Sequence, residues 1–181
     1  MFFEFIEEVI MNDLDVFLSR RSIRRYKQES IEPDVMIQLV KAGMAAPSAF
    51  NQQPWEFVIV HETKLLEKIA KLHPFASMAR YAAGFIIVCG LPKKDTLLLD
   101  MWPQDCAAVT ENVLLAAHKI GLGAVWIGIY PNEKHMSIFK KVCHIPKEVI
   151  PFSGVCFGIP DTEKPPADRF DESRIHWNSW E

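Results

Sequence analysis

Four of the seven arginines in this 181-residue chain fall within six positions, and they are the residues best suited to bind a charged ligand. They are Arg20, Arg21, Arg24 and Arg25, with Ser22 between the two pairs. A guanidinium group presents paired donors that match phosphate oxygens, and a serine hydroxyl can add one more. The cluster therefore predicts a site for a phosphate-bearing ligand. A solvated basic turn without a ligand is the alternative, because basic runs usually lie on solvated faces and cations complement a helix C-terminus.

A second polar stretch, residues 46–55, forms a loop between Pro47 and Pro54. It carries the amides of Asn51 and Gln53, which both donate and accept hydrogen bonds. Such groups suit the edge of a heteroaromatic ring or a polyol. The alternative here is an ordinary polar loop on the surface.

Three glycines, Gly121, Gly123 and Gly128, are spaced along the apolar stretch 121–131. A dinucleotide-binding fingerprint needs its glycines to open a helix, whereas a strand follows the first pair here. We therefore reject a Rossmann site. Gly128 is instead a candidate for close approach of the backbone to a ligand.

Nothing else in the sequence indicates a nucleophile, a general base or a metal site. The six histidines lack metal-ligand spacing and are interpreted as surface or satisfied core residues, with His118 a partnered residue on a buried helix. No G-x-S-x-G motif occurs, and the paired acidic residues at 7–8 and 171–172 are interpreted as solvated. Any chemistry is therefore expected to be carried by a bound cofactor.

Length and composition predict one globular domain, residues 1–181. The chain is 49% hydrophobic and 24% charged, and its net charge is -3. Against this acidic background, the basic cluster suits a small anionic ligand better than nucleic acid or an anionic membrane.

The four cysteines are far apart in apolar settings, which predicts reduced core residues in a reducing compartment.

Residues 1–11 contain three glutamates and no lysine or arginine, which does not fit a signal peptide. They are either a helical N-terminal extension or lie upstream of a start at Met11. No apolar run approaches the roughly 18 residues of a membrane-spanning helix. We expect a cytoplasmic protein.

Hydrophobic periodicity predicts the elements that position these residues. The helix at 105–120, with Gly121 as its C-capping glycine, is apolar nearly all round and is expected to be central and to lie at a subunit interface. The segment 159–181 contains prolines, which oppose regular structure, but also Trp177 and Trp180, so we expect an arm packed on this subunit or a partner. Further helices are expected before Arg20 and at 33–46, 63–72 and 133–143, a short turn at 74–79, and strands at 55–60, 84–91, 121–131 and 152–158.

Taken in order, these segments resemble the FMN-dependent nitroreductase family. Residues 20–24 resemble its N-terminal phosphate-binding motif, and residues 47–55 resemble its second motif. The stretch 121–131 resembles the third motif, and Arg169 resembles the C-terminal arginine. The resemblance extends from Met11 to Trp180.

The resemblance implies an α+β, three-layer fold, in which a mostly antiparallel sheet is flanked by helices, and an intertwined homodimer with FMN at the interface. The phosphate end of FMN would contact the N-terminal motif and Arg169, and Arg24 would lie toward the ribityl chain and the N1/C2 edge of the flavin. Ser48 and Asn51 would come from the other subunit, and the segment 159–181 would pack on that subunit. The expected FMN contacts are Arg20, Arg21, Ser22, Arg24, Pro47, Ser48, Ala49, Asn51, Gln53, Trp126, Ile127, Gly128 and Arg169.

The chemistry implied by the resemblance is hydride transfer from NADH or NADPH to FMN N5, followed by ping-pong transfer to a nitroaromatic, a quinone or a similar flat acceptor. Two departures from the family pattern leave the acceptor open: the middle of the chain is short, and Phe50 occupies a position where small residues are common. Arg80 matches the family only loosely and is left out of the site. The alternatives are a dehalogenase or flavin-cleaving enzyme of the same fold, and a flavin-binding or sensing protein without turnover.

Overall fold

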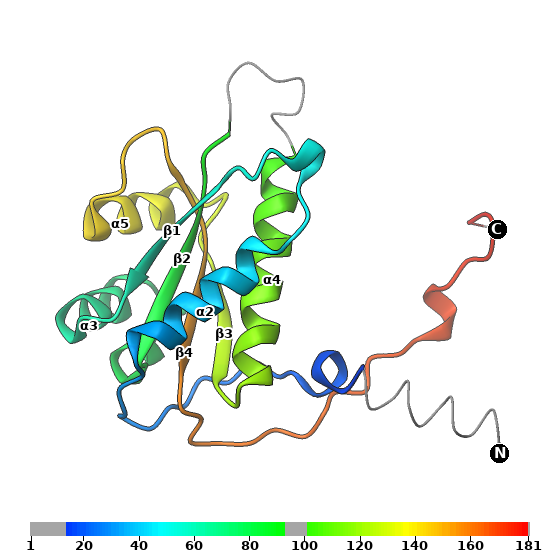
Figure 1. The fold of residues 1–181 in the computed structure, drawn as a ribbon, viewed down its shortest axis with the longest axis horizontal. Coiled ribbons are helices and arrows are strands. Elements are labelled where there is room, and N and C mark those ends of the chain that lie inside the picture. The colour runs from blue at the N-terminus through cyan, green and yellow to red at the C-terminus, as the bar shows by residue number, and fades with distance from the viewer. Residues whose placement is uncertain (1–13, 93–100, 181) are drawn as a thin grey trace.

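The computed structural model describes residues 14–92 and 101–180. A four-stranded sheet lies between two layers of helices (Figure 1). The strands are β1 (Trp55–Val60), β2 (Gly84–Gly90), β3 (Gly123–Gly128) and β4 (Ile150–Gly158). The expectation for the N-terminal extension falls on residues outside the described part of the chain. None of the helices in the described part is long and apolar enough to cross a membrane.

The sheet has the strand order β1-β2-β4-β3, and every neighbouring pair is antiparallel. All seven residues of β2 are buried, because this strand has neighbours on both sides and helices on both faces. Side chains of β2 alternate between two cores. Ile87 belongs to one, and Ile86 and Val88 belong to the other.

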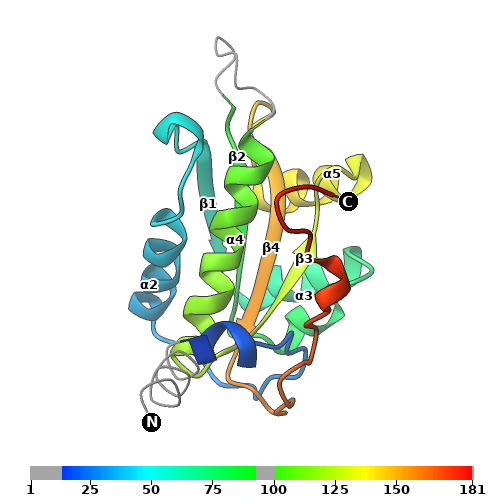
Figure 2. The same cartoon turned by 90° about the vertical axis from the view of Figure 1, so that its right-hand side faces the viewer.

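One helical layer consists of α2 (Pro33–Met44) and α4 (Trp102–Lys119), and the other consists of α3 (Thr63–Leu72) and α5 (Glu133–Cys143) (Figures 1 and 2). Two short 3-10 turns, η1 (Ala49–Asn51) and η2 (Ser77–Tyr81), follow α2 and α3. The predicted three-layer fold with an antiparallel sheet is therefore confirmed.

The central helix α4 begins three residues before the expected Asp105, because Pro103 is tolerated in the first turn of a helix, where its missing N–H costs no hydrogen bond. Its end is as expected. Gly121 adopts a φ of 82°, and its N–H donates to the His118 carbonyl while the Leu122 N–H donates to the Ala117 carbonyl. This capping turn also explains why β3 starts at Gly123 rather than at Gly121.

The N-terminal segment 20–27 and the chain that follows β4 lie side by side at the outer edge of the sheet. The Lys27 N–H donates to the Ile159 carbonyl over 2.9 Å, and the Asp161 N–H donates to the Arg25 carbonyl over 3.1 Å. Beyond this contact the tail leaves the body of the molecule, as Figure 1 shows. Its short turn η3 (Glu172–Arg174) and its aromatic side chains are exposed, so the tail does not pack on its own subunit.

Candidate functional site

The arginine segment extends the sheet beyond its edge strand β3. Ser22 bridges Ala124 in parallel, and the Ile23 N–H donates to the Ala124 carbonyl over 3.0 Å. The absence of a side chain at Gly123 allows this approach, because a Cβ there would lie 2.7 Å from Ile23 Cγ2. Ile23 thereby anchors the segment in the core and fixes the positions of the arginines around it.

Tyr26 is the second anchor of this segment. Its buried hydroxyl lies 2.7 Å from the Ile23 carbonyl and 3.0 Å from the Cys156 carbonyl. Burial raises the pKa of Tyr26 far above its ordinary value, so the phenol stays neutral. Its role is to hold the backbone.

Arg20 lies against the middle of α4. Its Nε is 3.3 Å from Glu111 Oε1, and its side chain is only 15% exposed. That Nε is buried and makes no hydrogen bond, because the ion pair is close without being aligned. A nearly buried guanidinium with an unpaired N–H is a fitting partner for an anionic oxygen.

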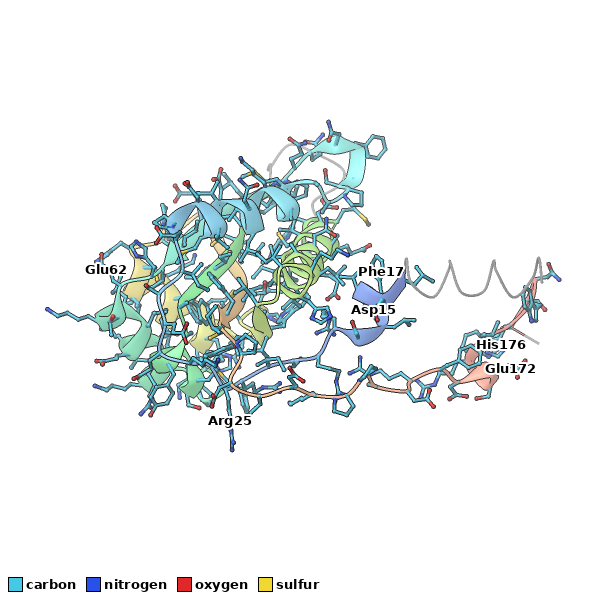
Figure 3. The ribbon with its side chains drawn as sticks, turned by 60° about the horizontal axis from the view of Figure 1, so that its bottom comes forward. Asp15, Phe17, Arg25, Glu62, Glu172 and His176 are labelled. Carbon is cyan, nitrogen blue, oxygen red and sulfur yellow. The ribbon has the colours of Figure 1, made fainter. Side chains whose placement is uncertain are left out.

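The chain after β4 brings a further cation to the arginine segment. Lys164 Nζ donates to the Ser22 carbonyl over 3.0 Å, and Arg21 Nη1 donates to the Pro165 carbonyl. Sequence reasoning missed Lys164, because a lone lysine in a proline-rich stretch carries no local signal of its tertiary neighbour. By contrast Arg25 points away from the body of the molecule (Figure 3).

A pocket of about 300 Å³ lies beside Arg21 and Lys164. Ser19 and His118 also line it, and Ser19 Oγ lies 2.7 Å from His118 Nε2. His118 is thus half-buried and has the polar partner that its place on α4 predicted.

A second pocket, of about 450 Å³, lies beside Arg24. It unites Arg24 with the predicted stretch 126–128, although the two are about a hundred positions apart in the sequence. The residues that line it are Arg24, Pro74, Phe75, Ser77, Met78, Trp126, Ile127 and Gly128. The four residues from 74 to 78 were missed by sequence reasoning, because only the packing of α3 and η2 against the sheet brings them here.

The outer edge of β3 presents backbone groups to this second pocket. Alternate residues of a strand direct their N–H and C=O groups to the same side. Ala124 accepts a hydrogen bond from Ile23 on the outer side, so Trp126 and Gly128 direct their backbone groups there too. At Gly128 an added Cβ would have no neighbour within 4 Å, which indicates open space. Together with the guanidinium of Arg24, this edge can bind the rim of a flat heteroaromatic ring.

Trp126 also contributes to an aromatic cluster on the α4 side of the sheet. Its ring centroid lies 6.1 Å from that of Phe152, and the two rings are inclined by 65°. Phe152 in turn contacts Trp102 and Tyr130. Packing of the indole therefore helps to fix the strand that lines the pocket.

The polar loop after α2 lies at the opposite end of α4 (Figure 1). The Ala49 N–H donates to Asp105 Oδ1 over 3.0 Å, whereas Ser19 contacts His118, 13 residues further along α4. At 1.5 Å per residue this separation is about 20 Å. Within one chain the structure therefore does not bring the loop residues to the arginine cluster; these are Pro47, Ser48, Ala49, Asn51 and Gln53.

The loop nevertheless has a defined shape. Phe50, Asn51 and Gln53 have φ values of 50°, 55° and 47°, which are uncommon for residues with a side chain. Two hydrogen bonds support the turn: the Gln53 N–H donates to Ser48 Oγ, and Gln53 Nε2 donates to Asn51 Oδ1. Such supported strain is common at functional sites.

Arg169 lies in the exposed tail. Within the described residues, no hydrogen bond or ion pair joins it to the arginine cluster. Its role in phosphate binding stays a prediction.

The four cysteines are free thiols, of which Cys89, Cys106 and Cys156 are buried. Burial raises the pKa of each of these three to about 12, so they are not nucleophiles at neutral pH. The described residues contain no group of three or more His, Cys, Asp or Glu that could hold a metal ion.

Residues 18–83 and 76–159 match the model of the Nitroreductase family. The chain belongs to the nitroreductase family. A relative from Archaeoglobus fulgidus, provisionally named a NADH dehydrogenase/NAD(P)H nitroreductase, is 41% identical over 170 residues, which cover 92% of this chain and 98% of the relative.

Solved structures agree with this family assignment. One from Parabacteroides distasonis, with the same provisional name, is 37% identical and has a TM-score of 0.86, covering 92% of this chain and 98% of that one. Another, from Desulfovibrio desulfuricans, is described as a nitroreductase in complex with FMN. It is 24% identical, has a TM-score of 0.78 over 93% of this chain and 97% of that one, and shares the fold of this nitroreductase-family chain.

Proposed function

We propose that this chain is an FMN-dependent oxidoreductase that takes a hydride from NADH or NADPH and passes it to a nitroaromatic, a quinone or a similar flat acceptor. The observation that carries the proposal is the pocket beside Arg24, where a cation and the open edge of β3 meet. Membership of the nitroreductase family, the name of the Archaeoglobus relative and the FMN held by the Desulfovibrio structure support it.

The residues present fit the phosphate end of FMN. Arg20 has a nearly buried guanidinium whose Nε lacks a hydrogen bond, and Arg21 and Ser22 stand next to it in the chain. We add Lys164 to this set, because it already donates to the Ser22 carbonyl. Arg169 would approach the phosphate from the tail. A dianionic phosphate needs several charge-assisted hydrogen bonds, and these groups can supply them.

The flavin ring would occupy the pocket beside Arg24. The guanidinium would lie at the N1/C2 edge, where a cation stabilises the anionic reduced flavin. The backbone of 126–128 would face the N5 edge, with the open side at Gly128. FMN would supply the hydride chemistry when bound. The protein would bind, orient and shield the ring.

The polar loop would complete the site from a second copy of the chain. Its residues Pro47, Ser48, Ala49, Asn51 and Gln53 lie about 20 Å from the C-terminal end of α4, at the far end of the same helix. A homodimer in which α4 of one chain lies beside α4 of the other would bring the two halves together. The exposed aromatic tail would pack on that partner.

The purified protein tests the proposal in one experiment with two steps. Its absorbance spectrum is recorded, and any bound chromophore is released and identified; we expect FMN. Oxidation of NADH and of NADPH is then followed with menadione as the acceptor. Steady turnover supports the reductase. Bound FMN without turnover would favour a flavin-binding or sensing protein, or a dehalogenase or flavin-cleaving enzyme. A protein that neither contains nor takes up FMN would refute the site.

The ping-pong order has its own measurement. Double-reciprocal plots at several acceptor concentrations are expected to be parallel, and intersecting lines would contradict two separate half-reactions.

The cytoplasmic location that the four free thiols suggest stays a prediction.

A further inference from the structure

A buried histidine lies directly behind the pocket beside Arg24. His73 caps the C-terminus of α3 and precedes Pro74 and Phe75, which line that pocket. It is only 1% exposed. Its ring centroid lies 4.2 Å from that of His135 and 5.7 Å from that of Phe139. A polar ring that is buried away from solvent needs hydrogen-bond partners for its nitrogen atoms.

The contacts of the ring determine where its proton is. The Phe75 N–H lies 3.3 Å from Nδ1 and donates to it. A neutral imidazole that accepts at Nδ1 carries its proton on Nε2. The neutral form is favoured, because burial and the neighbouring His135 lower the pKa of His73. Nε2 is buried and makes no hydrogen bond.

The candidate acceptor for the unpaired Nε2–H is the carbonyl of Gly128, because Gly128 lines the same pocket as Pro74 and Phe75, the two residues that follow His73. Burial lowers the pKa of His73, and the backbone of Gly128 opposes this effect by raising the pKa, as an acceptor does. Nδ1 already accepts the Phe75 N–H, so Nε2 is the nitrogen that can donate to this carbonyl. Gly128 is the exposed end of β3, and without a Cβ its peptide groups can rotate easily.

We propose that His73 is a positioning residue: its Nε2–H donates to the Gly128 carbonyl and fixes the strand end that faces the flavin N5 edge. His73 would not touch the flavin, since the residue is only 1% exposed and its Nε2 is buried. The inference rests on the proposed function, because it presumes FMN in the pocket beside Arg24. It adds a residue from outside the motifs, on an element whose place only the fold reveals.

Two substitutions of His73 distinguish a role as a hydrogen-bond donor from a role in filling space in the core. His73→Gln keeps an amide N–H near the place of Nε2, whereas His73→Leu fills the space without a donor. We expect His73→Leu to bind FMN about fivefold more weakly, the value of one ordinary hydrogen bond, and to shift the midpoint potential of the bound flavin. His73→Gln is expected to stay close to the wild type in both. His135→Gln is the matched control: it alters the ring that packs on His73 but leaves the donor, so both quantities should be unchanged.

The outcomes distinguish a failure of the positioning role from a failure of the proposed function. Wild-type affinity and potential in His73→Leu would refute the positioning role and leave the proposed function intact. Equal losses in His73→Leu and His73→Gln would assign His73 a purely structural role and also refute it. A wild-type protein that fails to bind FMN would overturn the proposed function and the positioning role together.

A measurement on the wild type removes any dependence on folding of the variants. Nitrogen NMR of histidine-labelled protein reports the tautomer of each ring. We expect His73 to be neutral with its proton on Nε2, and that proton to shift on addition of FMN, while the exposed His61 does not respond. A proton on Nδ1, or an Nε2 signal that ignores FMN, would overturn the proposal.

Discussion

The arginines of the N-terminal segment have identical side chains but different environments. Arg20 is nearly buried against Glu111, Arg24 lines the larger pocket, and Arg25 points away from the protein. Residue type alone cannot rank the arginines by their contribution to ligand binding, whereas burial and position can. Their substitutions are therefore expected to have unequal effects on FMN.

Arg24→Gln is expected to weaken FMN binding by about 10- to 100-fold, because a hydrogen bond to a charged group is worth about 1.5–3 kcal/mol. It should also lower the midpoint potential of the flavin, since a cation at N1 stabilises the reduced form. Titration with FMN and redox titration measure both effects. Arg25→Gln is the matched control and should retain wild-type values. Comparable losses in the two variants would mean that only the overall charge of the segment matters.

His73 also makes the stability of the fold depend on pH. Its pKa is lowered in the folded state from the ordinary 6.5, so on acidification the unfolded chain binds a proton there before the folded chain does. Stability therefore falls as the pH decreases below about 6.5, and above that value His73 contributes no pH dependence.

The sign can be checked by urea unfolding of the wild type and of His73→Gln over a pH series. The unfolding free energy of the wild type should decline relative to that of the variant as the medium is acidified. A constant difference between the two proteins would contradict the lowered pKa.

At the scale of elements, α4 organises both halves of the candidate site. Near its start Asp105 holds the polar loop, Glu111 lies beside Arg20 in its middle, and His118 contacts Ser19 near its end. The helix thus fixes the distance between the loop and the arginine segment. Asp105 itself is buried at 7% exposure and lies in the first turn, where a carboxylate complements the helix dipole.

Asp105→Ala is expected to lower the unfolding free energy by about 1–3 kcal/mol, because it leaves the Ala49 N–H without its acceptor. It should also weaken FMN binding if the loop reaches the cofactor of a second chain. Asp105→Asn keeps an oxygen at the accepting position and should lose much less. Thermal unfolding and FMN titration of the pair provide the comparison. Equal stability of the two variants would show that the loop does not depend on this hydrogen bond.

The sequence predicts most elements of this fold, because their patterns are local. The ranges 55–60, 63–72 and 133–143 coincide with β1, α3 and α5, since each shows clear periodicity with turn residues at its ends. The start of α4 was missed because Pro103 was not expected inside it. For β3 the predicted range was too long at both ends, since apolar residues continue into the capping turn before it and the loop after it.

The site could be predicted only in part, for a related reason. Arg24 and 126–128 were expected together and do line one pocket. Lys164 and the residues 74–78 carry no sequence signal, because only the packing of α3, η2 and the tail brings them there. The roles of the polar loop and of Arg169 depend on a second chain, so they stay predictions.

At the scale of the whole molecule, the described tail exposes three large aromatic side chains. Phe170, Trp177 and Trp180 are 78%, 83% and 84% exposed on a tail that leaves the body of the protein. The preceding residues 159–166 stay attached beside the arginine segment. Burial of apolar surface stabilises by roughly 25 cal/mol per Å², so covering these rings on a second chain would favour association. An exposed apolar patch of this kind commonly marks an interaction site.

Deletion of residues 167–181 is therefore expected to convert a dimer into a monomer and to abolish tight FMN binding, because it removes both the aromatic arm and Arg169. Light scattering measures the mass, and FMN titration measures the second effect. Arg169→Gln in the full chain is the control that separates the two losses: it should stay dimeric while binding FMN more weakly. A monomeric wild type would contradict the shared site. A truncated chain that stays dimeric and keeps FMN would show instead that α4 and its surroundings form the interface without the arm.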